Sequence, residues 1–273
     1  MTLQIQHGLL SEGNLQKYDW GTVRILMADY GKEHATARNI TLNKNSSVNY
    51  SVWADNCEGV LVVEEGSGEL YVGMITHKIA KGMAIHIPQH EAEKVQIKNT
   101  ETQELSITCV TLAHEELPPL GSVQVVDPAQ TPWKIFEYEA LGRQGVVGAS
   151  KRIGVLQLAF PIEQIPLHIH PHSDRFIRTI SGQGFVYVEP YKYDMGANDA
   201  FSAFPRSQVH TNGPRPGNWW IIWSFHFPWI DPEVDEENVG GSEAYAKYLA
   251  APPKALWKTK KELVDALTKH HNT

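Results

Sequence analysis

Two histidines separated by one residue, His168-Ile-His170, are the part of this sequence best suited to metal chemistry. Alternate residues of a β-strand point to the same face, so both imidazoles can enter the interior of one barrel. Neutral imidazole is a good ligand for iron, zinc, nickel and copper. The spacing therefore predicts a metal site on a strand that contains Ile169, with further ligands from other strands.

Short strands are expected through most of the chain, which predicts an all-β sandwich or barrel. β-Branched and aromatic residues dominate these segments, and Gly, Asn, Pro and Asp separate them. The expected strands are Val23–Met27, Gly59–Glu64, Glu69–Gly73, Met83–Ile87, Leu105–Leu112, Ile153–Phe160, Gly184–Val188 and Trp219–Phe227. Helical periodicity occurs only near the C-terminal end, in Ser242–Leu249 and after the capping box Thr259-Lys-Lys-Glu262.

The composition indicates a globular protein that does not bind nucleic acid. The 273 residues, 42% hydrophobic and 20% charged, suffice for two ordinary domains. A net charge of -7 argues against a basic surface for phosphates, although a small anionic substrate stays compatible with it. No signal-peptide pattern opens the sequence and no apolar run approaches the ~20 residues that span a bilayer. We therefore expect a cytoplasmic protein with a small-molecule partner and no membrane partner; a homodimer is left open.

The two β-rich halves repeat one pattern. In each, a Gly-x-Gly turn joins two strands and a later strand ends at proline: Gly66-Ser-Gly68 with Pro88, and Gly182-Gln-Gly184 with Pro205. Repetition of this kind is typical of duplicated small barrels. We expect a first barrel at 1–125, a second barrel at 126–235 and a helical extension at 236–273.

The order of these elements resembles the cupin superfamily. Its first motif runs Gly-x5-His-x-His-x3-4-Glu-x6-Gly, and its second runs Gly-x5-Pro-x-Gly-x2-His-x3-Asn. The matching positions are His168, His170 and Gly182 for the first motif and Pro205-Arg-Ser-Gln-Val-His210 for the second, with Ser207 in place of glycine. The resemblance implies an all-β fold of two tandem cupin (double-stranded β-helix or jelly-roll) barrels with short C-terminal helices.

The same resemblance implies that His210 is a third metal ligand, from a strand that faces the pair. Three nitrogens leave coordination positions open, which distinguishes a catalytic site from a closed structural one. The carboxylate position of the motif falls on Arg175 when counted back from Gly182, and on Asp174 when counted forward from His170. We favour a three-histidine site, with Asp174 as a less favoured fourth ligand, as an acceptor that orients a histidine, or as a surface residue. A bend after Pro171 is expected to turn His172 away.

Arg175 has two interpretations. It can pair with an acid on the barrel rim, or lie near the metal and hold a substrate carboxylate through a bidentate hydrogen bond. The pair Arg175-Phe176 and the final strand Ile221–Pro228 locally resemble ring-cleaving dioxygenases of the gentisate type, which use histidines without a glutamate. This chain is shorter than those enzymes and its spacing differs by a residue, so it is not assigned to them.

The densest aromatic segment is the expected strand Trp219–Phe227. By alternation, either Trp219, Ile221, Trp223 and Phe225 face inward, or Trp220, Ile222, Ser224 and His226 do. In the second case His226 is a candidate proton shuttle near the metal.

The first half lacks the histidines of the motif. Its segment Ser47–Ala54 contains none, and Glu93, even together with His90, supplies too few ligands for a dependable site. The entry Tyr18-Asp-Trp-Gly21 and the run Val60–Gly66 resemble sugar-phosphate isomerase cupins of the phosphomannose type. We therefore interpret the first barrel as a structural partner, with a metal-free binding pocket as the alternative.

These features favour a metal-dependent enzyme that acts on a small, carboxylate-bearing organic molecule. The carboxylate-free ligand set favours an iron(II) dioxygenase with Arg175 and His226 in catalytic roles. One divalent ion is expected, iron(II) first, with manganese, nickel, cobalt or zinc as alternatives. The rival functions are an isomerase, lyase or decarboxylase that uses the metal as a Lewis acid, and a storage or binding protein without turnover.

Overall fold

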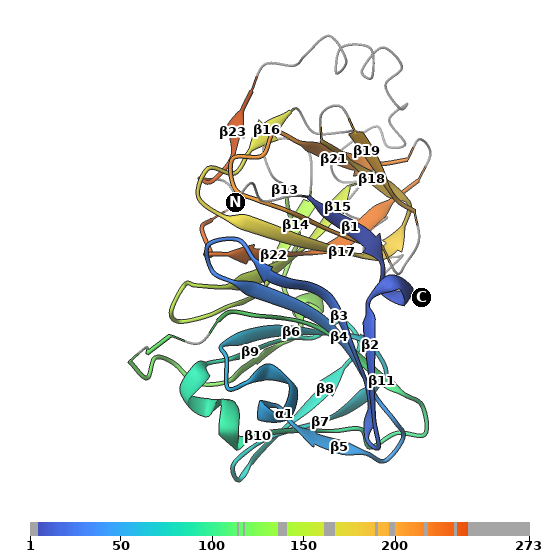
Figure 1. The fold of residues 1–273 in the computed structure, drawn as a ribbon, viewed down its shortest axis with the longest axis vertical. Coiled ribbons are helices and arrows are strands. Elements are labelled where there is room, and N and C mark those ends of the chain that lie inside the picture. Colours follow the sequence, from blue (N-terminus) through green and yellow to red (C-terminus); the bar gives the residue numbers. More distant parts are fainter. Residues whose placement is uncertain are drawn as a thin grey trace.

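The computed structural model describes residues 5–113, 115–116, 118–135, 141–160, 167–188, 191–196, 200–215, 218–231 and 234–239. Nearly all of the regular structure is β, in two halves that lie one above the other (Figure 1). Within the described ranges, no helix has the length and apolarity needed to cross a membrane. The predicted helices at 242–249 and 259–270 lie outside the described residues.

The first half contains a seven-stranded sheet in the order β12-β9-β6-β11-β4-β3-β2 and a four-stranded sheet in the order β5-β10-β7-β8. Its strands are β2 Asn14–Tyr18, β3 Gly21–Tyr30, β4 Ala35–Leu42, β5 Ser47–Asn49, β6 Gly59–Glu65, β7 Ser67–Val72, β8 Ile75–Ala80, β9 Ala84–Ile87, β10 Val95–Lys98, β11 Leu105–Thr111 and β12 Gln124–Val126. The short helices are α1 Ser51–Ala54 and the 3-10 turn η2 Gln89–Lys94.

The second half contains a seven-stranded sheet in the order β1-β20-β17-β22-β15-β14-β13, a three-stranded sheet β19-β18-β21 and the pair β16-β23. Its strands are β1 Gln6–Leu9, β13 Lys134–Ile135, β14 Leu141–Val147, β15 Gly154–Phe160, β16 His168–Ile169, β17 Asp174–Gly182, β18 Gly184–Val188, β19 Tyr191–Met195, β20 Ala200–Phe204, β21 Thr211–Pro214, β22 Trp220–Phe227 and β23 Glu237–Asn238. The 3-10 turns η1 Leu10–Glu12 and η3 Pro128–Gln130 complete the described elements.

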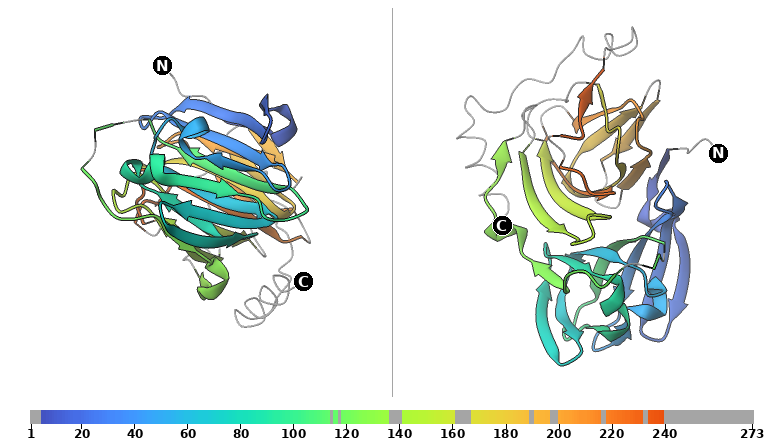
Figure 2. Two further views of the ribbon diagram at one scale, coloured as in Figure 1. Left: turned by 90° about the horizontal axis from the view of Figure 1, so that it is seen from below. Right: turned by 90° about the vertical axis from the view of Figure 1, so that its left-hand side faces the viewer.

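The two seven-stranded sheets face each other, so their central strands are buried on both faces, whereas the edge strand β2 is exposed. Along β22, Trp220 and Ile222 belong to the core inside the second half, whereas Trp223 and Phe225 belong to the core between the halves. Strand β6 contributes Val60 and Val62 to the same shared core. Burial on both faces explains why these strands read as continuous apolar runs. Figure 2 shows the sheets stacked as layers.

The repeated Gly-x-Gly turns occupy equivalent, sterically restricted positions in the two halves. Gly66 and Gly182 both have φ of 81°. A Cβ at Gly66 would lie 2.5 Å from the carbonyl oxygen of Glu104, and one at Gly182 would lie 1.8 Å from that of Trp219. Only glycine tolerates such a backbone angle and such a close approach, so the repeat has a structural cause.

Two strands lie across the boundaries that the sequence predicts. Strand β1 pairs with β20 of the second half, although it lies at the start of the expected first barrel. Strand β23 pairs with β16, although it lies within the expected helical extension. In both cases an otherwise open sheet edge is covered by hydrogen bonds from a distant segment, a pairing that local sequence does not encode. The division into 1–125, 126–235 and 236–273 stays a prediction.

Candidate metal centre

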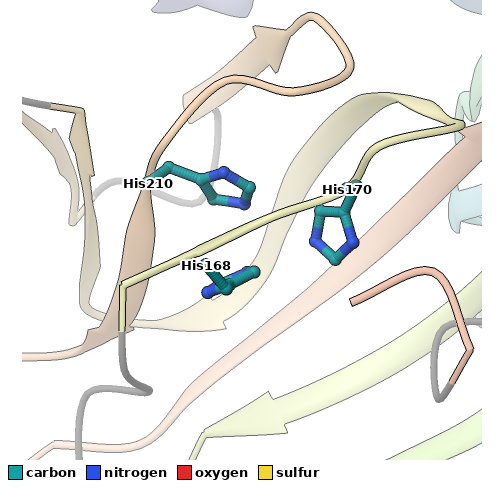
Figure 3. Close-up of side chains that lie close together, drawn as sticks. All are labelled: His168, His170 and His210. Carbon is teal, nitrogen blue, oxygen red and sulfur yellow. The ribbon is translucent and has the colours of Figure 1, made fainter. Parts of the chain in front are cut away.

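The structure brings His168, His170 and His210 together in the second half. Their candidate ligand nitrogens all lie within 4.8 Å of one another, and all three side chains are buried. Figure 3 shows the three rings grouped around a common space, two from the β16 segment and one from the segment before β21. A reciprocal pair of backbone hydrogen bonds fixes this arrangement, His168 N to His210 O at 2.9 Å and His210 N to His168 O at 3.0 Å.

The ring of His210 is oriented as a metal ligand requires. Its Nδ1 lies 2.7 Å from the backbone oxygen of Gln208, and because a carbonyl only accepts, Nδ1 must carry the proton. The lone pair of a neutral ring is then on Nε2, which is buried and has no hydrogen-bond partner among the described residues. Burial, followed by the neighbouring His168, holds the pKa of His210 well below 6.5, so the ring stays neutral. A buried, unsatisfied nitrogen beside two further imidazoles fits a bound cation.

His170 has two competing partners at Nδ1. The backbone oxygen of Asp235 lies 3.2 Å away, and Nη2 of Arg175 lies 2.6 Å away. A proton on Nδ1, directed at Asp235, leaves Nε2 for a metal. A guanidinium only donates, so the contact with Arg175 favours the opposite tautomer. His170 can thus serve as a ligand, but Arg175 opposes the form that does so.

Arg175 lies in the interior beside the histidines. Its side chain is buried, Nη1 lies 2.5 Å from Nε2 of His226, and Nη2 lies 4.0 Å from Oδ2 of Asp235. Burial lowers the pKa of Arg175 to about 10, partly offset by Asp235, so the guanidinium keeps its charge at neutral pH. Arg175 thus has an acid neighbour and also lies beside the histidines, but Asp235 is fully buried and not on a barrel rim, so both interpretations of Arg175 stay predictions. Its Nε is a buried donor without a partner among the described residues.

His226 lies on the inward-facing side of β22, as in the second of the two alternations. Besides Arg175, its Nε2 lies 2.9 Å from Oγ of Ser224, and its ring packs on Trp229 with centroids 5.2 Å apart. Burial, followed by the charge of Arg175, holds the pKa of His226 well below 6.5. The residue is therefore a neutral imidazole connected to the metal centre through Arg175.

Asp174 lies apart from the histidine cluster. It precedes Arg175 on β17 and so points to the opposite face, toward the first half. Its two carboxylate oxygens accept hydrogen bonds from Arg206, with Nη2 at 2.7 Å and the backbone N at 2.7 Å, and from the backbone N of Lys32 at 3.3 Å. A carboxylate occupied in this way joins the two halves, and we leave it out of the proposed ligand set.

Asp235 belongs to the surroundings of the cluster, although sequence reasoning missed it. This buried aspartate accepts hydrogen bonds from the hydroxyl of Ser173 and from the backbone N of His172, and its carbonyl faces His170. It follows an acidic, non-periodic segment, so no pattern marks it. His172 itself is exposed and outside the cluster, as the bend after Pro171 predicts.

The first half uses the residues of its degenerate motif for local contacts. Glu93 accepts a hydrogen bond of 3.0 Å from Nδ2 of Asn56. His90 lies 3.5 Å from a carboxylate oxygen of Glu91. Among the described residues, the only group of three or more candidate ligands is the histidine cluster of the second half.

Comparison with known proteins identifies the fold. Neither a protein-family model nor a curated protein sequence matches the chain. A Pseudomonas aeruginosa protein described as glyoxylate-induced aligns with a TM-score of 0.65 at 14% identity, over 80% of this chain and 85% of that one. Oxalate decarboxylase of Bacillus subtilis aligns with a TM-score of 0.61 at 11% identity, over 90% of this chain and 83% of that one. The 7S globulin of Momordica charantia aligns with a TM-score of 0.59 at 10% identity, over 82% and 84% of the two chains. These are cupin-type proteins, and the predicted all-β fold of tandem cupin barrels is confirmed.

Proposed function

We propose that this chain is a metal-dependent enzyme acting on a small carboxylate-bearing organic molecule, and specifically an iron(II) dioxygenase. The observation that supports this most directly is the buried cluster His168, His170 and His210, in which Nε2 of His210 is oriented and has no hydrogen-bond partner in the described part of the chain. An iron(II) ion held by three imidazoles would supply open coordination positions for two small molecules at once.

The residues around the cluster suit a charged substrate in a dry site. Arg175 keeps a positive charge within the barrel, and its Nε donor has no partner in the ranges that the structure describes, so it is the candidate anchor for a substrate carboxylate. His226, neutral and bonded to Arg175, is the candidate carrier of a proton. Trp220 and Ile222, on the same face of β22, belong to the core that excludes water from this region.

A second candidate is a lyase-type reaction such as a decarboxylation. It is favoured by the similarity to oxalate decarboxylase, a protein described with Mn(II) centres, which extends over 97% of this chain in one comparison. At 11% identity this similarity concerns the fold alone. The choice between a dioxygenase and a lyase therefore depends on the chemistry that the histidine cluster performs, which has to be measured.

The first experiment measures metal content by plasma emission on untagged protein, for the wild type, His210→Ala and the control His172→Ala. We expect about one ion per chain in the wild type and the control, and none in His210→Ala. His172 is the matched control because it is exposed and outside the cluster. The absence of metal from the wild type after anaerobic reconstitution with iron(II) would contradict a metal enzyme.

The second experiment separates the two reactions. Iron-loaded protein is offered small hydroxy-, keto- and aromatic carboxylates in an oxygen electrode. The dioxygenase predicts that dioxygen and substrate are consumed in equal amounts, and that His210→Ala consumes neither. Turnover without dioxygen uptake, supported by manganese as well as iron, would replace the dioxygenase with the lyase.

A further inference from the structure

A large cavity lies between the two halves, on the other face of the sheet from the histidines. Its volume is about 1150 Å³, and it is lined by β6, by the segment around η3, and by strands β14, β15, β17 and β22. Arg178 lines this cavity, whereas Arg175 on the same strand lies at the metal cluster. The cavity is therefore a separate space from the metal centre.

A row of four side chains crosses the sheet at the wall of this cavity. Strand register pairs Arg143 with Gln157, Gln157 with Trp223, and Trp223 with Arg178. The neighbours two residues away along the strands are apolar: Val155 and Phe225 belong to the shared core on one side, and Ala159 and Ile221 to a smaller core on the other. Buried polar groups inside an apolar surface need hydrogen-bond or ionic partners, so we ask which partner each polar side chain of the row has.

Most charges around the cavity are already neutralised within the protein. Arg178 binds Glu64 of the first half, with Nε 2.8 Å from Oε1 and Nη2 3.0 Å from Oε2. Lys81 binds Glu65 at 2.6 Å. Arg178 and Lys81 thus each have a carboxylate partner. Among the described residues that line the cavity, Arg143 is the cation that has no carboxylate within 4.0 Å.

Arg143 is buried and has donors to spare. The residue as a whole is only 8% exposed, and the one hydrogen bond of its side chain among the described residues runs from Nε to Oε1 of Gln157, at 2.6 Å. The guanidinium carbon lies 4.5 Å from the centroid of the Trp133 ring. A guanidinium carries five N–H donors in a planar fork, so its outer edge is available to a carboxylate. Asp127 is the nearby acid, but its carboxylate caps η3 by accepting from the backbone N of Ala129 at 2.9 Å.

We propose that this cavity is a second ligand site, which binds a small carboxylate with a flat apolar body. The carboxylate would pair with the outer edge of Arg143, and the body would lie against Trp133 and Trp223, which both line the cavity. Asp127 compensates the charge of Arg143 only from a distance, and a bound carboxylate would neutralise this buried charge by direct contact. The site is independent of the proposed metal chemistry, because no residue of the histidine cluster lines the cavity.

The test is calorimetric titration of metal-free protein with benzoate and with its neutral isostere benzamide. We expect saturable benzoate binding at one site per chain, and benzamide binding at least about tenfold weaker, since a charge-assisted bidentate pair is lost. Arg143→Gln should weaken benzoate at least about tenfold, and Trp133→Leu should weaken both ligands.

Two controls localise the effect. Arg24→Gln removes an arginine of β3 that does not line the cavity, and His210→Ala alters the metal cluster; both should bind benzoate as the wild type does. No saturable benzoate binding, equal binding of benzamide, or loss of binding in His210→Ala would overturn the proposal. The melting transition of Arg143→Gln shows whether this variant folds. If it does not, the proposal is still tested by comparing benzoate with benzamide in the wild type and by measuring benzoate binding in His210→Ala.

Discussion

Nη2 of Arg175 lies 2.6 Å from Nδ1 of His170, so a permanent donor occupies the atom that must itself carry a proton for His170 to bind a metal through Nε2. The charge of Arg175 also lowers the pKa of His170, second only to the effect of burial. Arg175 therefore opposes a cation in two ways, through the tautomer and through repulsion. If Arg175 also holds a substrate carboxylate, as we propose, this one residue would couple substrate binding to metal binding.

Replacing Arg175 with methionine should accordingly tighten metal binding. We expect an increase of about tenfold, the low end of what neighbours of metal ligands contribute, because Nδ1 of His170 is then free to donate to Asp235. Competition with a chromophoric chelator for iron(II) or manganese(II) measures the change. Arg178→Met is the matched control, since it removes a buried arginine from the same strand that faces the cavity instead. Weaker metal binding in Arg175→Met would show that Arg175 orients His170.

The buried histidines predict that the metal-free protein loses stability in mild acid. Burial is the largest cause for each of them, and it holds the pKa values of His170, His210 and His226 below 6.5 in the folded state. As pH falls through about 6.5, the unfolded chain takes up protons that the folded chain does not, so the free energy of unfolding decreases. Each histidine contributes about 1.4 kcal/mol per pH unit below that value.

Urea unfolding of metal-free protein at several pH values between about 7.5 and 5.5 measures this dependence. In the variant His226→Gln, the slope of the free energy of unfolding against pH should be smaller by the contribution of one histidine, about 1.4 kcal/mol per pH unit. Saturating metal should steepen the loss of stability on acidification, because bound histidines must also release the ion. A free energy of unfolding that stays constant from about pH 6.5 to 5.5 would show that these rings are protonated in the folded protein.

Asp174→Asn should reduce stability without changing the metal content. The buried carboxylate accepts hydrogen bonds from the backbone N, Nε and Nη2 of Arg206, and an amide removes the nearest counter-charge of that guanidinium, leaving Glu33 at 4.0 Å. Breaking a buried pair in this way lowers the free energy of unfolding by about 3 kcal/mol. Asp194→Asn is the control, since Asp194 and Arg215 form an exposed pair that contributes at most about 1 kcal/mol. Loss of the metal from an equally stable Asp174→Asn variant would restore Asp174 as a ligand.

Local patterns predicted the parts of the fold and the site that depend on local geometry. Each expected strand coincides with an observed one; Gly184–Val188 matches β18 at both ends. The sequence placed His168 and His170 on one strand by its two-residue period; the structure brings the two side chains together, but β16 ends at Ile169, so His170 lies just beyond the strand. The short edge strands β13, β16 and β23 have two residues each, too few for any period to appear.

The remaining contacts join segments that are distant in the chain, and sequence patterns carry no direct trace of them. The pairing of β1 with β20, the carbonyl of Asp235 at His170 and the Asp174–Arg206 pair are all of this kind. His210 could be placed only through the motif of a known family, because nothing in its own neighbourhood shows that it faces His168. The same holds for the row of side chains at the cavity wall. Arg143, Gln157 and Arg178 lie on separate strands, and only the strand register brings them into one row.

The duplicated glycine turns make a last prediction about stability. Gly182→Ala should lower the free energy of unfolding by at least about 3 kcal/mol, because the new Cβ combines a left-handed backbone with a severe collision. That Cβ would lie 1.8 Å from the carbonyl oxygen of Trp219, at the start of the strand that carries His226. Gly73→Ala isolates the backbone effect: Gly73 also has a positive φ, 58°, but no atom lies within 4 Å of the position that its Cβ would take. We therefore expect a loss of only about 1 kcal/mol there. Chemical denaturation of both variants measures the difference, and equal losses would mean that β17 and β22 separate easily enough to accommodate a methyl group at this turn.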